Sequence, residues 1–209
     1  MVYAMRETEL AAKLYNLLKK SGVGSLKKVY KGRSVTSKEF KDVVSEWYGE
    51  RIPWPLIEPD LILVFEDYKK VIDEVMIVAV ELKCFQTSSD KRLRRAFREI
   101  GQPLRCYVFG FDSAVLWHIF EDVEEDVIKD YTDMVYEVIE KLKLPLAYIA
   151  TKMIKDQYKI YKPLNLKPQS IQYLVMYLRN LCDHTRNPAM DEKIKKRRSA
   201  LKVALSIPS

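Results

Sequence analysis

The feature that most constrains the fold is a pair of apolar segments separated by a short polar stretch. Residues 61–65 (LILVF) form an unbroken apolar run directly after Pro59-Asp60, and residues 71–83 form a longer segment rich in β-branched residues. The polar residues 66–70 between them make an antiparallel hairpin the simplest connection. Apolar residues occupy both alternating faces of the second segment. This pattern predicts a strand that is covered on both sides, in the centre of a sheet.

The rest of the chain divides into amphipathic helices and shorter strands. Apolar residues at helical spacing predict helices over residues 7–20, 37–48 and 90–104, and extended runs predict strands over residues 27–35, 105–110 and 114–120. From residue 123 onward the pattern is mainly helical, with proline interruptions. We therefore expect an α/β fold with a central mixed sheet flanked by helices. The expected organisation is a core, residues 1–122, with a helical and basic C-terminal extension, residues 123–209, packed on it.

Composition excludes several kinds of protein. The 209 residues include only three cysteines (Cys84, Cys106 and Cys182), without a C-x-x-C pair, and two histidines. We expect the cysteines to be buried thiols, and any bound metal to be held by oxygen atoms. No apolar stretch approaches the ~20 residues that span a bilayer, so no membrane association is expected. The first residues lack the apolar core of a secretory signal, which favours an intracellular protein.

The net charge of +7 is unevenly distributed. Residues 151–209 contain 13 Lys/Arg against 4 Asp/Glu, whereas residues 1–150 contain 23 against 25. Residues 121–140 are strongly acidic. The acidic segment and the basic end could pair within one molecule or between subunits, or the basic end could bind a polyanion such as a nucleic acid. The distribution of charge along the sequence is compatible with each of these interpretations.

Carboxylates and a lysine flank the two predicted buried strands. Asp60 precedes the first strand, and Glu81-Leu82-Lys83 ends the second. Side chains alternate along a strand, so Glu81 and Lys83 share a face, and a hairpin would bring Asp60 to the same end. Two adjacent carboxylates suit Mg²⁺, which prefers oxygen ligands at ~2.0–2.1 Å and keeps several waters. Such an ion can activate water and stabilise charge during phosphodiester hydrolysis, and a neighbouring lysine can assist it.

The acid-x-lysine spacing alone carries little information. It occurs four times, at Glu39–Lys41, Asp67–Lys69, Glu81–Lys83 and Asp191–Lys193. Only the Glu81 instance ends a predicted buried strand and has a Pro-Asp before another apolar strand upstream. The alternative interpretation is an ion pair at the rim of a sheet, which contributes little to stability.

These residues resemble the PD-(D/E)XK nuclease superfamily. The resemblance covers roughly residues 7–120 and is closest in style to archaeal Holliday-junction resolvases and small nucleases of archaea and their viruses. It implies a restriction-endonuclease-like core in which Asp60, Glu81 and the carbonyl of Leu82 bind Mg²⁺ or Mn²⁺. Lys83 would be the catalytic lysine.

The resemblance also suggests further site residues. Glu7 on the first helix fits a Glu-x-x-Leu-x-x-x-Leu pattern that completes the site in many members, with Glu39 and Glu46 as rivals because a whole extra helix intervenes before Asp60. Gln102 would line the site as in RecB-type members, although the spacing from Gln102 to Tyr107 is one residue longer than usual in that subgroup. The missing cysteines disfavour iron–sulfur members. His118 is interpreted simply as a strand residue.

Basic residues provide candidate DNA contacts. Those on the predicted helix of residues 90–104 and those near the C-terminus could neutralise phosphates: Arg94, Arg95, Arg98, Lys195, Lys196, Arg197 and Arg198. For the C-terminal group the alternative is pairing with the acidic segment. Lysines 152, 155, 159 and 162 interleave with tyrosines, which is also compatible with a solvated helical face.

The resulting expectation is a Mg²⁺-dependent DNA endonuclease, with branched recombination or replication intermediates as candidate substrates. A homodimer would suit two cuts on a symmetric junction. An apolar stripe over residues 171–182 could form the dimer seam but is better explained as core. The rivals are a non-catalytic DNA-binding protein that retains the fold, and an assembly protein held together by its acidic helix and basic end.

Overall fold

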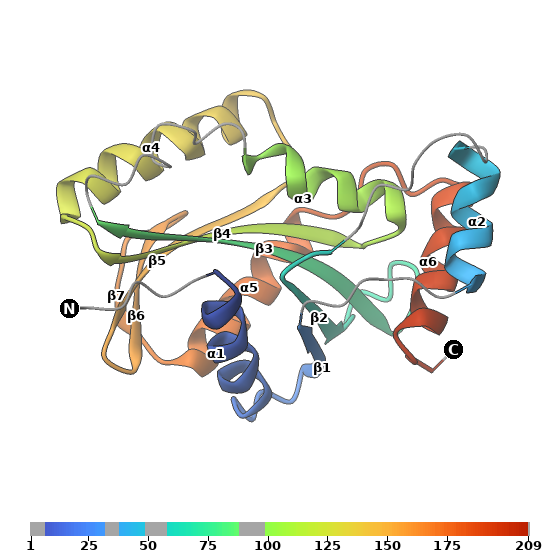
Figure 1. Ribbon diagram of the computed structural model, residues 1–209, viewed down its shortest axis with the longest axis horizontal. Helices are drawn as coiled ribbons and strands as arrows, with labels where there is room; N and C mark the ends of the chain where they lie inside the picture. Colours follow the sequence, from blue (N-terminus) through green and yellow to red (C-terminus); the bar gives the residue numbers. More distant parts are fainter. Residues whose placement is uncertain (1–6, 32–37, 49–57, 88–98, 209) are drawn as a thin grey trace.

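A seven-stranded mixed sheet with helices on both faces forms the protein (Figure 1). The computed structural model describes residues 7–31, 38–48, 58–87 and 99–208. The strands lie in the sheet in sequence order: β1 (Leu26–Lys31), β2 (Leu61–Glu66), β3 (Val75–Thr87), β4 (Ser113–Asp122), β5 (Ala147–Ile154), β6 (Gln157–Lys162) and β7 (Leu166–Gln169). The helices in the described residues are α1 (Glu7–Lys19), α2 (Lys38–Tyr48), α3 (Gly101–Arg105), α4 (Glu125–Lys141), α5 (Ile171–His184) and α6 (Glu192–Ala204), with a 3₁₀ helix η2 (Cys106–Phe109).

The predicted hairpin is confirmed. Strands β2 and β3 pair antiparallel from Leu61 opposite Val80 to Glu66 opposite Val75. The strand predicted from residue 71 begins only at Val75, because the Asp67 side chain accepts backbone N–H groups of Lys69 and Val71 and holds the turn. Strand β3 pairs parallel with β4 on its other side, and β4 pairs parallel with β5. The central position of β3 is therefore as predicted.

Helices cover the two faces of the sheet unequally. Helices α1 and α5 lie on one face, and their apolar stripes pack on alternate residues of β2, β3 and β4 (Figure 1). On the other face α4 covers one part of the sheet, while α2 and α6 lie side by side over β2 and the start of β3. The α5 stripe, including Leu174, Leu178 and Cys182, is buried within this core. All three cysteines are buried and free, as predicted.

Residues 105–110 do not form the predicted strand. They form the end of α3 and the 3₁₀ helix η2, which ends at Gly110 in a left-handed conformation, φ 91°. The Asn187 side chain donates to the carbonyls of Tyr107 and Phe111 and so holds this compact turn from a distant segment. The residue types alone favour an extended segment, but the hydrogen bonds from Asn187 stabilise the helical turn instead.

The expectation of a mainly helical C-terminal extension is only partly correct. Residues 147–169 contribute β5, β6 and β7, which extend the sheet beyond β4. Apolar residues alternate with lysines in QYKIYK of β6, a strand period that the helical interpretation overlooked. Helices α4, α5 and α6 agree with the prediction. The expected boundary at residues 122/123 lies between β4 and α4, and the sheet runs across it.

Candidate functional site

Asp60 lies beside the middle of β3, where β2 begins. Leu61 is the first residue of β2 and pairs with Val80, so β3 continues from Glu81 without a β2 partner. Here the Asp60 carboxylate replaces the acceptor that a neighbouring strand would provide: its Oδ2 accepts the Leu82 backbone N–H at 2.7 Å. The hairpin therefore brings Asp60 to the Glu81-Leu82-Lys83 segment as predicted, with its contact at the Leu82 backbone.

Glu81 and Lys83 lie on the same face of β3 and form an ion pair. The distance from Lys83 Nζ to Glu81 Oε1 is 2.8 Å, and only 10% of the Glu81 side chain and 12% of the Lys83 side chain are exposed. Glu99, just before α3, places Oε2 3.7 Å from Lys83 Nζ. Sequence reasoning missed Glu99, because only the tertiary fold brings it to β3 and no local pattern marks it.

The charged pair interrupts an otherwise apolar surface. On this face β3 presents Ile77 and Ala79 before the pair and Phe85 after it, all buried. Burying charges is costly unless they are paired, so such a position on a central strand is a candidate for function. Cys106 of η2 lies near: its own burial, followed by the charge of Glu81, raises the pKa of this thiol to about 12. The thiol is therefore protonated at neutral pH.

The Leu82 carbonyl is expected at the same edge as Asp60. Within a β-strand the N–H and C=O of one residue point to the same side, and the Leu82 N–H points to Asp60, away from β4. Two carboxylates and one carbonyl are oxygen donors that suit Mg²⁺, which keeps several waters. In the part of the chain that is described, however, no three or more His, Cys, Asp or Glu side chains are grouped as a metal site.

His118 is the neighbour of Lys83 on β4, a relation that sequence reasoning did not anticipate. The two residues are partners in the parallel β3–β4 register, so their side chains share a face. Burial, with a further contribution from the positive charge of Lys83, lowers the pKa of His118 to about 3. The imidazole is therefore neutral at physiological pH.

Two of the other acid-x-lysine instances have structural roles. Asp67 is buried and forms a two-pronged ion pair with Arg186, at 2.9 and 3.0 Å. Asp191 is the N-cap of α6, where its side chain accepts the Ile194 N–H. The Glu39 side chain lies outside the described residues. Among those described, Glu81–Lys83 is the instance that lies within a strand.

The remaining candidate site residues, Glu7, Glu46 and Gln102, lie on three different helices. Glu7 begins α1, and its side chain is outside the description. Glu46 is exposed on α2 and forms an ion pair with Lys196 of α6 at 2.8 Å. Gln102 lies on α3 with Oε1 buried and lacking a hydrogen-bond partner among the described residues. A free buried acceptor is compatible with the site-lining role implied by the resemblance.

Two of the predicted DNA-contacting arginines are buried, which contradicts their prediction. Arg197 donates to the Val108 carbonyl at 2.7 Å, and Arg198 forms a two-pronged ion pair with the buried Asp112. Lys195 is exposed and pairs with Glu192. Charge density along α6 suggested an exposed face, whereas half of its cations anchor the helix. Arg94, Arg95 and Arg98 lie outside the described residues.

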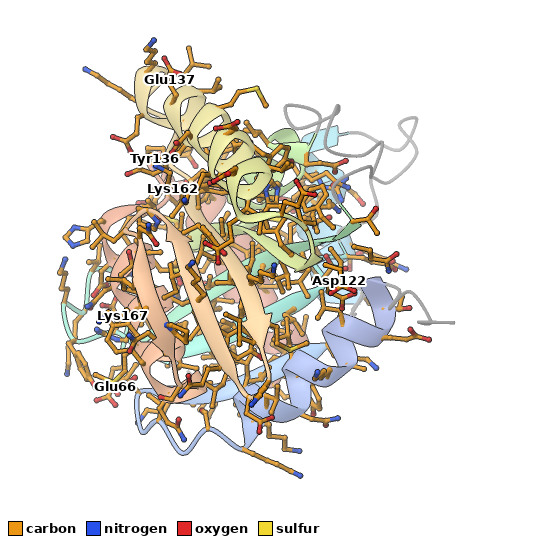
Figure 2. The ribbon with its side chains drawn as sticks, turned by 90° about the vertical axis from the view of Figure 1, so that its left-hand side faces the viewer. Glu66, Asp122, Tyr136, Glu137, Lys162 and Lys167 are labelled. Atoms are coloured by element: carbon orange, nitrogen blue, oxygen red, sulfur yellow. The ribbon has the colours of Figure 1, made fainter. Side chains whose placement is uncertain are left out.

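The acidic segment pairs with basic residues of the same chain. Lys159 of β6 contacts Glu125 of α4 at 2.7 Å, and Lys162 forms an ion pair with Asp133. Figure 2 shows Lys162 extending from β6 toward Tyr136 of α4, and its Nζ lies 5.3 Å from the Tyr136 ring centre. Internal pairing of the acidic segment is therefore confirmed for lysines of β6. The C-terminal cations of α6, for which the same pairing was the alternative, contact Glu46, Asp73 and Asp112 instead.

Comparisons with known proteins give no match, either among protein-family models or among curated protein sequences. In the described part of the chain, none of the helices combines the length and apolar character needed to cross a bilayer.

Proposed function

We propose that the protein is a Mg²⁺-dependent DNA endonuclease that hydrolyses phosphodiester bonds at the Asp60–Glu81–Lys83 site. The observation that carries this proposal is the start of β2 beside β3, where Asp60 binds the Leu82 N–H and the neighbouring residues Glu81 and Lys83 of β3 form an ion pair. The α/β architecture with a mixed central sheet is compatible with the resemblance to PD-(D/E)XK nucleases. Branched DNA is the substrate we expect first.

Each residue has a distinct role in this proposal. Asp60, Glu81 and the Leu82 carbonyl would hold Mg²⁺, or Mn²⁺ in its place, and the bound ion would supply an activated water and charge stabilisation on phosphate oxygens. Lys83 neutralises the charge that develops on the attacked phosphate. Gln102 lines the site, and Glu7 is the candidate for a further carboxylate.

Cleavage assays test the proposal directly. Purified protein is incubated with Mg²⁺ or Mn²⁺ and four DNA forms: linear, supercoiled, single-stranded and branched. We expect Lys83→Met to lower the cleavage rate at least about 100-fold, as expected when a charge-stabilising donor is removed, with nearly unchanged DNA affinity. Asp60→Asn should do the same. The matched control is Lys70→Ala, which removes an exposed lysine from the turn of the same hairpin.

The second candidate is a DNA-binding protein without catalysis. One observation favours it: Asp60 satisfies the Leu82 N–H just as Asp112 satisfies the Ile77 N–H at 2.7 Å where β4 begins, so Asp60 has a purely structural use. This candidate predicts salt-sensitive DNA binding without cleavage of any DNA form. Binding that does not weaken with salt would favour an assembly role instead.

The dimer remains part of the proposal. The α5 stripe is buried within the subunit and is therefore not available as its seam. Light scattering of the protein, with and without branched DNA, measures the mass of the complex. A monomer in both conditions would contradict the dimer and leave the chemistry of the site unaffected.

A further inference from the structure

His118 occupies an aromatic box on the face that carries Lys83. Its ring is fully buried, 5.2 Å from the ring of Phe85 and 5.4 Å from that of Tyr131. Nδ1 lies 3.1 Å from the Tyr148 hydroxyl. The second ring nitrogen, Nε2, is buried and has no hydrogen-bond partner among the described residues. A phenylalanine would fill this box without that cost, so the polar nitrogen needs an explanation.

The neighbouring charge determines which nitrogen carries the proton. A neutral imidazole has one N–H donor and one acceptor nitrogen. Lys83 is the register partner of His118 and acts on it electrostatically. An N–H dipole directed at an ammonium is repulsive, whereas a lone pair attracts it. Tyr148 belongs to β5 and Lys83 to β3, on opposite sides of β4. The Tyr148 contact engages Nδ1, so Nε2 is the nitrogen left to act as the acceptor that the Lys83 charge favours.

Lys83 currently contacts the carboxylate proposed to bind the metal. Its ammonium is 2.8 Å from Glu81 Oε1 and 3.7 Å from Glu99 Oε2. A divalent ion at Glu81 would compete with the ammonium for the same oxygens. The lysine stem has four rotatable bonds, so the ammonium can move while the β3 backbone stays fixed.

We propose that His118 is a positioning residue for Lys83, whose ammonium donates to His118 Nε2 when it leaves Glu81. This inference rests on the proposed function, in which Glu81 is a metal ligand and Lys83 acts on the phosphate. The buried acceptor gives the displaced ammonium a fixed second position on the same face. Tyr148 holds the imidazole in the required tautomer from the side opposite Lys83.

Nitrogen-15 NMR of the histidine ring tests the proposal without measuring activity. In the wild-type protein Nδ1 should show the resonance of a protonated nitrogen and Nε2 that of an unprotonated one. Glu81→Gln removes the nearer of the two carboxylates that contact Lys83, at 2.8 Å against 3.7 Å for Glu99. In metal-free protein the Nε2 resonance of this variant should move upfield as it accepts a hydrogen bond from Lys83. The double variant Glu81→Gln/Lys83→Met is the matched control and should not show this shift. The proposal is wrong if Nε2 carries the proton in the wild type, or if the Nε2 resonance is the same in the wild type and in Glu81→Gln.

Titration with Mg²⁺ separates this inference from the proposed function. Mg²⁺ should produce the same upfield shift in the wild type and none in Lys83→Met. If Glu81→Gln gives the shift but Mg²⁺ neither shifts the resonance nor supports cleavage, His118 accepts from Lys83 and the nuclease proposal fails. If cleavage is observed while Glu81→Gln leaves Nε2 unchanged, the nuclease proposal stands and the role of His118 is wrong.

Two substitutions of His118 give a functional measurement. Asn places its amide near Nδ1 and leaves nothing at Nε2, whereas Gln reaches the Nε2 position. We expect His118→Asn to lower kcat about 10–100-fold at constant KM, and His118→Gln to recover most of that loss. Cooperative urea unfolding checks that both variants fold. Equal loss in two folded variants would contradict the positioning role.

Discussion

Asp112 shows how a single carboxylate can organise a sheet edge. It is almost completely buried, accepts the Ile77 N–H where β4 begins, and holds the Arg198 guanidinium at 2.7 and 3.0 Å. Arg198 also donates to the Val75 carbonyl and contacts Asp73, which forms an ion pair with Lys202. Burial opposes the charge of Asp73, but its bonds to Lys202 and Arg198 outweigh that effect and lower its pKa.

Removal of the Asp112 carboxylate should be strongly destabilising. Asp112→Ala leaves the Arg198 charge buried with only part of its partners, and breaking one side of a buried ion pair costs about 3–5 kcal/mol. Urea denaturation measures the loss of unfolding free energy. Asp126→Ala on the exposed face of α4 is the control, and it should stay within about 0.5 kcal/mol. Equal effects of the two substitutions would contradict the anchoring role.

The buried His118 should make the protein sensitive to acid. Its pKa is about 3 in the folded protein against 6.5 when exposed. Between these values the unfolded state binds more protons, so stability falls as the pH falls from about 7 to 3, by up to about 1.4 kcal/mol per pH unit. In His118→Phe the unfolding free energy should therefore depend less steeply on pH, as measured by urea unfolding at several pH values. A slope as steep in His118→Phe as in the wild type would contradict this assignment.

At the scale of elements, α6 approaches the turn after η2 backbone to backbone. A Cβ added to Gly110 would lie 2.5 Å from the Arg198 backbone nitrogen, and φ at Gly110 is 91°, a conformation that side chains disfavour. This close approach positions α6 so that Arg197 and Arg198 reach the carbonyl and carboxylate of the turn. Packing of a whole helix therefore depends on one glycine.

Gly110→Ala should displace α6 from the sheet. We expect a loss of at least about 2 kcal/mol in unfolding free energy, since overpacking and the left-handed backbone both oppose the methyl group. Thermal and urea unfolding measure it. Gly24→Ala provides the control, because a Cβ there meets nothing within 4 Å. A neutral result at Gly110 would show that α6 adjusts without cost.

At the scale of the whole molecule, the two halves of the sequence share their core and their charges. The cluster under α1 and α5 joins Leu10 and Leu14 to Leu174 and Leu178. Cations of the basic end pair with acids from the first part of the chain, as in Arg186–Asp67, Lys196–Glu46 and Arg198–Asp112. Several cations of residues 151–209 are thus paired within the chain, which reduces the number available to a polyanion.

A fragment of residues 1–122 should therefore not fold by itself. It would lose α5 from one face, the Arg198 partner of Asp112, and the β5 partner of β4, which would leave an exposed apolar edge strand. We expect an aggregated or unfolded product by circular dichroism and proton NMR. A soluble fragment with cooperative unfolding would instead establish residues 1–122 as an independent domain.

Local sequence patterns predict those elements whose conformation depends mainly on their own residues. The β2–β3 hairpin, the position of Asp60 beside Glu81-Leu82-Lys83, and helices α1, α4, α5 and α6 all follow from periodicity, turn residues and strand alternation. These features depend on residues close in sequence or on one short turn, so the sequence by itself determined them.

Tertiary contacts decided the rest. The turn at residues 105–110 depends on hydrogen bonds from Asn187. The burial of Arg197 and Arg198 depends on Val108 and Asp112. Glu99 and His118 come close to Lys83 only because of the crossover between the parallel strands β3 and β4. Each contact joins residues far apart in the chain. A polar residue has the same local signature whether it faces solvent or a buried partner, and only the packed structure supplies that partner.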